Sequence, residues 1–306
     1  AERGAWFSQD KYSMFIHWGL YSIPAGEWQG KTYYGISEWL MSGRVAGIAK
    51  QEYKQLANQF NPTEFDAKAI VQLAVDSGMK NIVITAKHHE GFAMYHSKNS
   101  DYDIEDATSF KRDPLKELAK ACADAGIGLG FYYSQMQDWY EQGSASISWQ
   151  SDKQEGDFTE YFDRKVVPQV TELLTEYGPI RTVWFDTPGS MTKVQSQKLV
   201  DLVRSLQPAA MINSRIGNGV GDFSTLGDHS LSQVNHPGLW ETIDTTNNSW
   251  GYAGYDKNWK SGTEILHRLI STVGRGGNFM INVGPKGNGE VPAMAAKGLR
   301  RAGKWL

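Results

Sequence analysis

The run Thr182-Val183-Trp184-Phe185-Asp186 leads directly into Thr187-Pro188-Gly189. A strand-like segment therefore ends in a carboxylate, and a Pro-Gly pair turns the chain immediately after it. In a β/α barrel the catalytic groups lie at this carboxyl end of the strands. Trp184 shares a strand face with Asp186 because side chains alternate, so we expect an aromatic wall beside the acid. A carboxylate there can attack the anomeric carbon of a sugar, or it can simply cap the next helix.

Strand-like and helix-like segments alternate along the chain on both sides of this run. Strands are predicted at residues 13–22, 81–87, 128–134, 182–186, 209–215, 239–243 and 278–284. Helices are predicted at residues 65–77, 113–125, 157–177, 191–206, 263–274 and 293–306. This alternation indicates an α/β fold with a parallel sheet and outer helices. Seven strands are one short of a closed barrel, so we expect a (β/α)8 TIM-like barrel that is degenerate in some elements.

Length and composition favour one domain and narrow the class of ligand. The chain has 306 residues, and because a barrel needs roughly 250, we expect a single catalytic β/α-barrel domain over residues 1–306. The formal net charge of -3, without charge runs, argues against nucleic acid and membrane surfaces as partners. The chain contains 11 Trp, which is more than a core requires. Ring faces in a carbohydrate-binding cleft would explain them.

Two single residues bear on cellular location and on redox chemistry. Cys122 is the one cysteine of the sequence and stands in an Ala/Leu-rich helical stretch, so we expect it to be buried as a small apolar residue. The sequence begins with Ala1 rather than Met. A removed signal peptide, and with it a secreted or periplasmic location, is therefore an expectation.

Polar, aromatic and titratable residues gather just after the predicted strands and are scarce within them. They are His17-Trp18, His88-His89-Glu90, Tyr132-Tyr133-Ser134, Trp184 with Asp186, Asn213-Ser214-Arg215, Trp240-Glu241 and Asn248-Ser249-Trp250. A single histidine at a strand end is more often structural than functional. Because every strand end carries such groups, the pattern predicts a site at one mouth of the barrel.

The histidines could instead bind a metal ion. Amidohydrolase-type barrels usually carry two histidines, separated by one residue, on their first strand, but His17 stands alone. His88 and His89 are adjacent, so on a strand they would point apart and rarely bind one ion. We therefore expect neither a metal nor a cofactor, and neutral imidazoles suit sugar hydroxyls better.

Several of these motifs together resemble glycoside hydrolase family 29, the retaining α-L-fucosidases. Residues 14–28 (MFIHWGLYSIPAGEW) resemble the opening of that family. The later matches follow in order: KHHEGF at 87–92, WFD at 184–186, NSR at 213–215, WE at 240–241, NSWGY at 248–252 and GGNFMINVGP at 276–285. The resemblance runs from about Met14 to the end of the sequence. It implies a degenerate (β/α)8 barrel, double displacement and no metal.

The same resemblance implies roles for individual residues. Asp186 matches the nucleophile, Glu38-Trp39 the Glu-Trp pair over the sugar, and Trp250 an aromatic near the fucose methyl group. Positions that hold the fucose hydroxyls and ring are matched by His17, His88, His89, Tyr133, Trp184 and Arg215. The expected substrate partner is a fucosylated oligosaccharide or glycoconjugate.

The sequence departs from the family pattern in two places. Members commonly carry a β-sandwich after the barrel, and we do not expect one within these residues. In Leu226-Gly227-Asp228-His229-Ser230-Leu231, a serine stands where related sequences often have the acid/base Glu. We rank Asp228 first as acid/base because it lies in the right loop, with Glu241 close behind at a strand end. Glu38 and Glu27 are the further candidates.

Two alternative functions stay open at this point. An α-L-galactosidase of the same fold would need one polar residue where Trp250 and its apolar neighbours favour the fucose methyl group. A non-catalytic fucose-binding protein would keep the rings and histidines but lack a working acid. Asp186 argues against the second alternative, while Ser230 argues for it. Hydrolysis of an aryl α-L-fucoside would distinguish an active enzyme from a non-catalytic binding protein.

Overall fold

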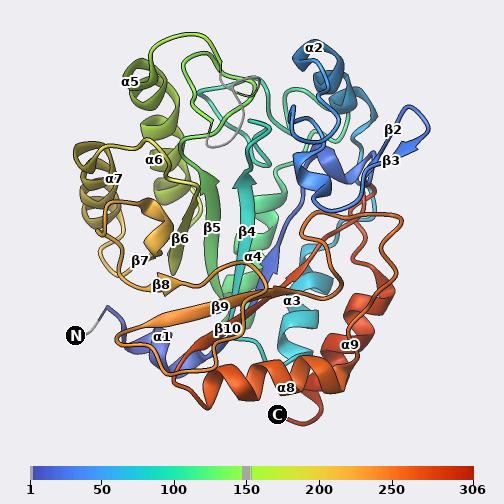
Figure 1. Cartoon of the computed structure of the whole chain (residues 1–306), viewed down its shortest axis with the longest axis vertical. Coiled ribbons are helices and arrows are strands. Elements are labelled where there is room, and N and C mark those ends of the chain that lie inside the picture. The colour runs from blue at the N-terminus through green and yellow to red at the C-terminus, as the bar shows by residue number, and fades with distance from the viewer. Residues whose placement is uncertain (1–2, 147–151, 153) are drawn as a thin grey trace.

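Parallel strands form the centre of the molecule in the computed structural model, which describes residues 3–146, 152 and 154–306 (Figure 1). Among these residues one sheet has the strand order β7-β6-β5-β4-β1-β10-β9-β8, and all its pairs are parallel. The strands are β1 (Tyr12–Ile16), β4 (Asn81–Lys87), β5 (Gly128–Ser134), β6 (Thr182–Asp186), β7 (Met211–Ile212), β8 (Ser224–Thr225), β9 (Trp240–Thr245) and β10 (Asn278–Val283). A separate antiparallel hairpin is formed by β2 (Glu27–Trp28) and β3 (Lys31–Thr32).

The sheet curls until its two edge strands approach each other. A single parallel bridge between Asn213 and Phe223 joins the residue after β7 to the residue before β8. The N–H of Asp222 also donates to the carbonyl oxygen of Ile212 at 2.6 Å. The described sheet is therefore a curled α/β sheet of eight parallel strands whose edges meet at one point.

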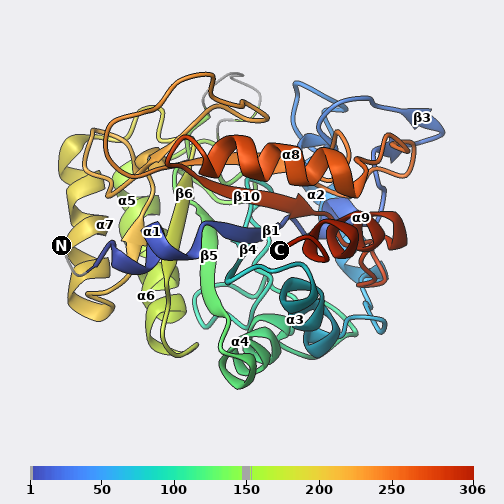
Figure 2. The same cartoon turned by 90° about the horizontal axis from the view of Figure 1, so that it is seen from below.

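Helices cover the outside of this sheet (Figure 2). The α-helices are α1 (Ala5–Asp10), α2 (Lys50–Tyr53), α3 (Ala67–Asp76), α4 (Pro114–Ala125), α5 (Phe158–Tyr161), α6 (Val167–Thr175), α7 (Lys193–Leu206), α8 (Gly262–Val273) and α9 (Ala293–Gly303). Asp66, Asp113 and Asp157 begin three of them by accepting a backbone N–H. Across the described ranges, no helix is both long and apolar enough to cross a membrane.

Three predicted strands have the observed bounds, at 81–87, 128–134 and 182–186. The first predicted strand was too long, because it ends at Ile16 and Leu20–Ser22 is a 3-10 helix. The segment 209–215 was also wrong in part, since only Met211–Ile212 pair as a strand and Ser214–Ile216 form a 3-10 turn. The eighth strand, Ser224–Thr225, escaped prediction because two residues carry no periodicity.

The predicted helix 157–177 is present but irregular. It consists of α5, a π-helical turn at Phe162–Val166, and α6. Pro168 follows the π turn and has no backbone N–H, so the regular hydrogen-bond ladder cannot continue through this position. The α4 prediction holds in detail, since Pro114 begins the helix and Gly126 ends it in the left-handed conformation at φ 70°.

Side-chain alternation along the strands separates two apolar layers. Met14, Ile16, Val183 and Phe185 belong to the larger cluster between sheet and helices. The inner face of the curled sheet carries Phe15, Val83, Tyr132, Trp184, Ile243 and Met280. Residues at the carboxyl ends that continue this inner alternation therefore face one mouth of the sheet, and this geometry positions the candidate site.

Candidate active site

A hollow at the carboxyl ends of the strands gathers most of the predicted site residues. It comprises about 300 Å³ of space, part of which is open to solvent. Its lining consists of Phe15, His17, Glu38, Trp39, His88, Tyr132, Trp184, Asp186, Arg215, Asp228, Ile243 and Trp250. These residues come from seven strands or the loops after them and from the 3-10 turn Ser37–Trp39. Side chains distant in sequence thus converge on one small volume.

Asp186 ends β6 and is held as an ionised carboxylate. Its Oδ1 accepts a hydrogen bond from Nη1 of Arg215 at 3.0 Å, and its Oδ2 accepts one from the hydroxyl of Tyr132 at 2.9 Å. Burial alone would raise the pKa of this carboxyl, but the Arg215 guanidinium and the Tyr132 hydroxyl outweigh burial and hold the pKa below its usual value. A buried carboxylate that stays charged at neutral pH suits a nucleophile.

Arg215 connects the two acids of the hollow. Its Nη2 donates to Oδ1 of Asp228 at 2.6 Å, while Nη1 binds Asp186. The guanidinium carbon lies 5.0 Å from the ring centre of Trp184, so the cation stacks on the aromatic wall. Burial would lower the pKa of Arg215, but the two carboxylates raise it, and the guanidinium remains charged.

The three histidines are neutral hydrogen-bonding groups. Burial lowers the pKa of His17 and of His89 to about 4, and it lowers the pKa of His88 as well. Nδ1 of His17 lies 2.8 Å from Oδ1 of Asn282, whose amide nitrogen donates to a carbonyl, so we infer that Nδ1 carries the proton. Nε2 of His17 is then an acceptor for a ligand hydroxyl.

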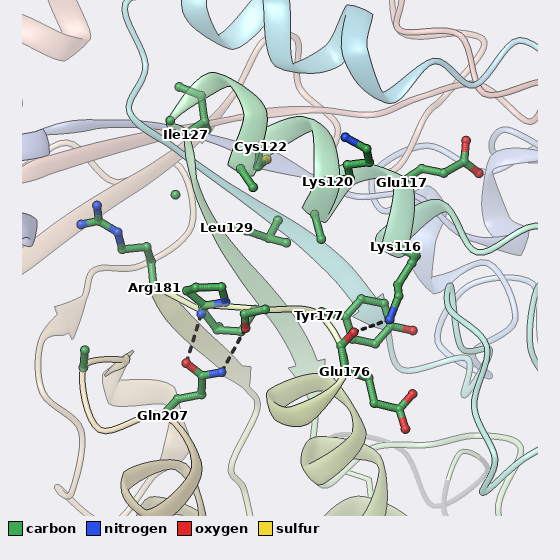
Figure 3. Close-up of a pocket in the computed structure, with 18 of the residues that line it drawn as sticks. Lys116, Glu117, Lys120, Cys122, Ile127, Leu129, Glu176, Tyr177, Arg181 and Gln207 are labelled. Carbon is green, nitrogen blue, oxygen red and sulfur yellow. Dashed lines mark hydrogen bonds between the residues drawn. The ribbon is translucent and has the colours of Figure 1, made fainter.

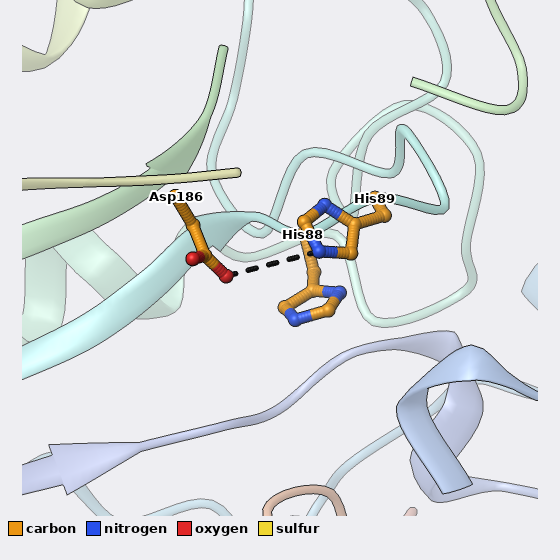
Figure 4. A group of neighbouring side chains, drawn as sticks. All are labelled: His88, His89 and Asp186. Atoms are coloured by element: carbon orange, nitrogen blue, oxygen red, sulfur yellow. Dashed lines mark ion pairs between the residues drawn. The ribbon is translucent and has the colours of Figure 1, made fainter. Parts of the chain in front are cut away.

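His89 has the same tautomer by the same reasoning. Its Nδ1 lies 2.6 Å from the hydroxyl of Ser134, which donates its own proton to the carbonyl of Gln137. Nε2 of His89 is therefore unprotonated and lies 3.8 Å from Oδ2 of Asp186 (Figure 4). Nε2 of His89 is thus an acceptor for one ligand hydroxyl beside Asp186.

His88 and His89 lie side by side, which corrects the expectation that they point apart. Their ring centres are 4.2 Å apart, because the chain has already left β4 at Lys87. Together with Asp186 they offer three possible metal-ligand atoms within 4.8 Å of one another. Oδ1 of Asp186 is engaged by the Arg215 cation, and that positive charge opposes a divalent ion in the same place. The donor set therefore fits sugar hydroxyls better than a metal.

The other walls of the hollow are flat and apolar. Trp184 and Asp186 both line it, as their two-residue spacing predicts. Phe15, Ile243 and Trp250 add an apolar patch, and Trp39 packs on the His89 ring at 5.0 Å between ring centres. A ligand with one apolar edge and several hydroxyls matches this combination of apolar walls and hydrogen-bonding groups.

The three acid candidates occupy different places. Asp228 lines the hollow, and its side chain is 52% exposed at the mouth. Glu38 also lines the hollow but is buried and accepts the Gly251 N–H at 3.1 Å, and burial raises its pKa to about 7. Glu241 does not line the hollow: it lies behind Trp184 and accepts the indole N–H at 2.6 Å. The geometry gives Glu241 a supporting position.

Glu27, the fourth candidate acid, and Ser230 are not among the residues that line this hollow. Glu27 is on the β2–β3 hairpin, where its carboxylate accepts the Thr32 hydroxyl at 3.4 Å. Ser230, at the position where a Glu was expected, is exposed and closes a turn through its N–H to the carbonyl of Gly227.

Tyr132, rather than Tyr133, faces the site, and this corrects the residue expected to hold the sugar. Tyr133 directs its hydroxyl to Oε1 of Gln169 in α6 at 2.7 Å and is fully buried on the helix side. Tyr132 pairs with Trp184 across β5 and β6. Side-chain alternation between the two strands was the signal that could have found Tyr132, and also Phe15 two residues before His17.

A wider hollow lies at the opposite end of the strands (Figure 3). It borders the start of β5 and the residues before β6, and comprises about 1720 Å³ of space, much of it open to solvent. Its walls include Leu129, Ile127, Tyr177 and the buried Cys122. The burial predicted for Cys122 is thereby confirmed. Among the residues that the structure describes, no histidine lines this hollow, and its acids, Glu117 and Glu176, are on helix surfaces.

The whole chain, residues 1–306, matches the model of the family described as Alpha-L-fucosidase. The alpha-L-fucosidase of Dictyostelium discoideum is 27% identical, with 98% of this chain and 69% of that protein covered. The tissue alpha-L-fucosidase of Homo sapiens is 28% identical, with 99% of this chain and 67% of that protein covered. This chain spans about two thirds of the length of such relatives, from 64% of the Caenorhabditis elegans protein upward.

Solved structures agree over the full length. The alpha-L-fucosidase AlfC from Lactobacillus casei, in complex with its α-L-fucose product, superimposes with a TM-score of 0.91 at 42% identity. The match covers 100% of this chain and 98% of that one. A variant of AlfC in complex with Fucα(1,6)GlcNAc gives a TM-score of 0.92 at 41% identity, with the same two shares covered.

Proposed function

This chain belongs to the alpha-L-fucosidase family of glycoside hydrolases, and on that basis we propose how it removes terminal α-L-fucose from fucosylated glycans with retention of configuration. The observation that carries the proposal is the state of Asp186. It is a buried carboxylate kept ionised by Arg215 and Tyr132 beside an aromatic wall. That combination is the requirement for a nucleophile that forms a covalent glycosyl-enzyme.

In the first step an Asp186 oxygen bonds to the anomeric carbon of fucose, and the bond from that carbon to the leaving oxygen breaks. The leaving oxygen takes a proton from Asp228, the acid at the mouth. In the second step water attacks the same carbon, passes a proton to Asp228, and releases Asp186 as a carboxylate. Two inversions at one carbon give net retention.

The assignment of Asp228 rests on its exposure. An enzyme that removes a terminal sugar holds that sugar inside, so its leaving group must extend toward solvent. Asp228 is the half-exposed carboxylate at the mouth, whereas Glu38 is only 3% exposed. Because Arg215 binds Oδ1 of Asp228, the transferable proton is assigned to Oδ2. Arg215 thus orients both acids at once.

The remaining lining residues are assigned to sugar recognition. His17 and His89 accept hydroxyl protons at Nε2, and Trp184 stacks against the ring. Phe15, Ile243 and Trp250 enclose the methyl group that distinguishes L-fucose from L-galactose. Because the ring and C–H surfaces of these three residues suit a methyl group better than a hydroxyl, we propose preference for the fucoside over the galactoside. The bridge between Asn213 and Phe223 supports a degenerate (β/α)8 barrel as the frame.

Release of fucose from 4-nitrophenyl α-L-fucoside tests the activity, and an NMR time course tests the stereochemistry. We expect α-L-fucose to appear first and to mutarotate afterward. If β-L-fucose appears first, the enzyme inverts, and the nucleophile assignment is wrong. The corresponding α-L-galactoside should react at least tenfold more slowly in kcat/KM, about 1.4 kcal/mol. Equal rates would contradict the role of the apolar patch.

A further inference from the structure

Outside the catalytic hollow, the exposed Tyr34 and the half-buried Tyr255 form an aromatic pair. Tyr34, which follows the β2–β3 hairpin, is 78% exposed. Its ring centre lies 4.8 Å from that of Tyr255, with the planes at 69°. Exposed tyrosine rings offer a CH–π surface that matches the apolar faces of pyranose rings.

Hydrogen bonds anchor Tyr255 and the backbone next to Tyr34. The N–H of Gly35 donates to the Tyr255 hydroxyl at 2.8 Å, and the N–H of Gly254 donates to the carbonyl of Ala25 at 2.9 Å. Asp256 fixes the loop that carries Tyr255: one oxygen accepts the N–H of Asn248 at 2.9 Å and the Ser249 hydroxyl at 2.6 Å. A pre-ordered aromatic surface binds at a lower entropic cost than a mobile one.

A shallow hollow beside Tyr255 adds hydrogen-bonding groups to this surface. It encloses about 580 Å³ of empty space, and its lining includes Gly35, Ser249, and the exposed side chains of Asn248, Lys257 and Asn258. Amides next to an aromatic face suit a neutral sugar, which presents hydroxyl groups at its edge and C–H groups on its face.

The same two chain segments line both hollows. Gly35 is three residues from Glu38, so their Cα atoms are at most about 11 Å apart. Asn248 is two residues from Trp250, so their Cα atoms are at most about 7 Å apart. The N–H of Gly251 donates to Glu38 at 3.1 Å, which ties the segments together between the hollows. On the other side of Trp250, the ring of His229 packs at 5.0 Å, and His229 follows the mouth residue Asp228.

We propose that Tyr34, Tyr255 and the adjoining hollow form a secondary sugar-binding site for the leaving-group side of the glycan. A neutral pyranose two or more residues beyond the cleaved fucose stacks on the tyrosine pair and bonds to Asn248 and Asn258. The proposal rests on the proposed function, because it assumes that the glycan leaves the catalytic hollow past Asp228 and Trp250. It predicts that longer fucosylated glycans react better than short ones.

Kinetics with two substrates test this site. One is 4-nitrophenyl α-L-fucoside, and the other is a fucosylated oligosaccharide of four or more neutral sugars that the enzyme cleaves. Tyr34→Ala should leave kcat/KM on the nitrophenyl substrate within twofold and lower it about tenfold on the oligosaccharide, mainly through KM. Tyr34→Phe should retain the wild-type value. Trp305→Ala is the matched control, since Trp305 is 74% exposed elsewhere.

Equal values for wild type and Tyr34→Ala on the oligosaccharide would overturn the site, as would equal losses on both substrates. A direct titration tests binding at the secondary site independently of the proposed catalytic function. The probe is lacto-N-tetraose, a neutral oligosaccharide without fucose, and NMR detects its binding to unmodified enzyme and to Tyr34→Ala. Weaker binding by Tyr34→Ala supports the site even if no fucoside is hydrolysed. Identical titrations, or no binding to the wild type, contradict it.

Discussion

The hydroxyl of Tyr132 donates to Oδ2 of Asp186 at 2.9 Å across two neighbouring strands. The next residue of β5, Tyr133, faces the opposite side of the sheet and bonds to Gln169 in α6. Tyr132 therefore contributes to the nucleophile, whereas the adjacent Tyr133 contributes to packing. A substitution at either tyrosine serves as the control for the same substitution at the other.

Tyr132→Phe should lower kcat/KM by about 10- to 100-fold, because a hydrogen bond to a charged group is worth about 1.5–3 kcal/mol. The acidic limb of the pH profile should also move to higher pH, since this hydroxyl helps to lower the pKa of Asp186. Tyr133→Phe should reduce thermal stability without moving that limb. A profile of Tyr132→Phe that superimposes on the wild type would contradict the assigned contact.

Asp228→Asn should impair natural oligosaccharides far more than the nitrophenyl substrate, whose phenolate leaves without a proton. General acid help is typically worth about 10²–10⁴-fold, and added azide should restore part of the second step on the nitrophenyl substrate. Glu241→Gln retains an acceptor for the Trp184 indole and should show neither effect. If Glu241→Gln shows both effects and Asp228→Asn shows neither, Glu241 is the acid/base and Asp228 is not. If neither variant shows these effects, Glu38 becomes the next candidate for the acid/base.

The fold could be predicted wherever side-chain periodicity is long and regular. Strands β4, β5 and β6 contain five to seven residues each and were located to the residue. The strands of two residues, β7 and β8, are defined by pairing rather than by their own sequence, so local pattern cannot delimit them. The same limit applies to His88 and His89, whose placement depends on where the chain leaves β4.

The site could be predicted as a set, but the direction of each side chain could not always be predicted. Asp186 and Trp184 follow from alternation within one strand. Choosing Tyr132 over Tyr133 requires the register between β5 and β6, which single-sequence reasoning does not supply. The position of Glu241 behind Trp184 depends in the same way on β9 and β6, which lie far apart in the strand order.

The buried carboxyl of Glu90 should make stability depend on pH. Burial raises its pKa to about 8 from an ordinary 4.5, so the folded state holds a proton that the unfolded state releases. The stabilisation is complete below about pH 4.5 and is lost as the pH rises to about 8. In Glu90→Gln, which can still accept the Tyr53 hydroxyl, the fall in Tm over this range should be shallower.

Glu64→Gln, at an exposed position, is the control for that series and should keep the wild-type slope of Tm against pH. A Glu90→Gln variant whose Tm falls as steeply as that of the wild type would show that Glu90 does not carry the proton.

Asp186→Asn should retain fucose binding but lose more than nine tenths of its turnover, since the amide cannot form the glycosyl-enzyme. A loss of this size corresponds to a barrier at least about 1.4 kcal/mol higher. Asp163→Asn is the matched control, because Asp163 is half-exposed and pairs with Lys198 far from the site. Turnover above a tenth of wild type in Asp186→Asn would argue against a nucleophilic role.

Trapping of the covalent intermediate tests the central claim most directly. A 2-deoxy-2-fluoro-L-fucosyl fluoride forms the glycosyl-enzyme readily and releases it slowly, so digestion and mass spectrometry can locate the attached sugar. We predict one fluorofucosyl group on the peptide that contains Asp186, bound through its side chain. A label on the peptide containing Asp228 or Glu241, or full inactivation without any label, would contradict the account.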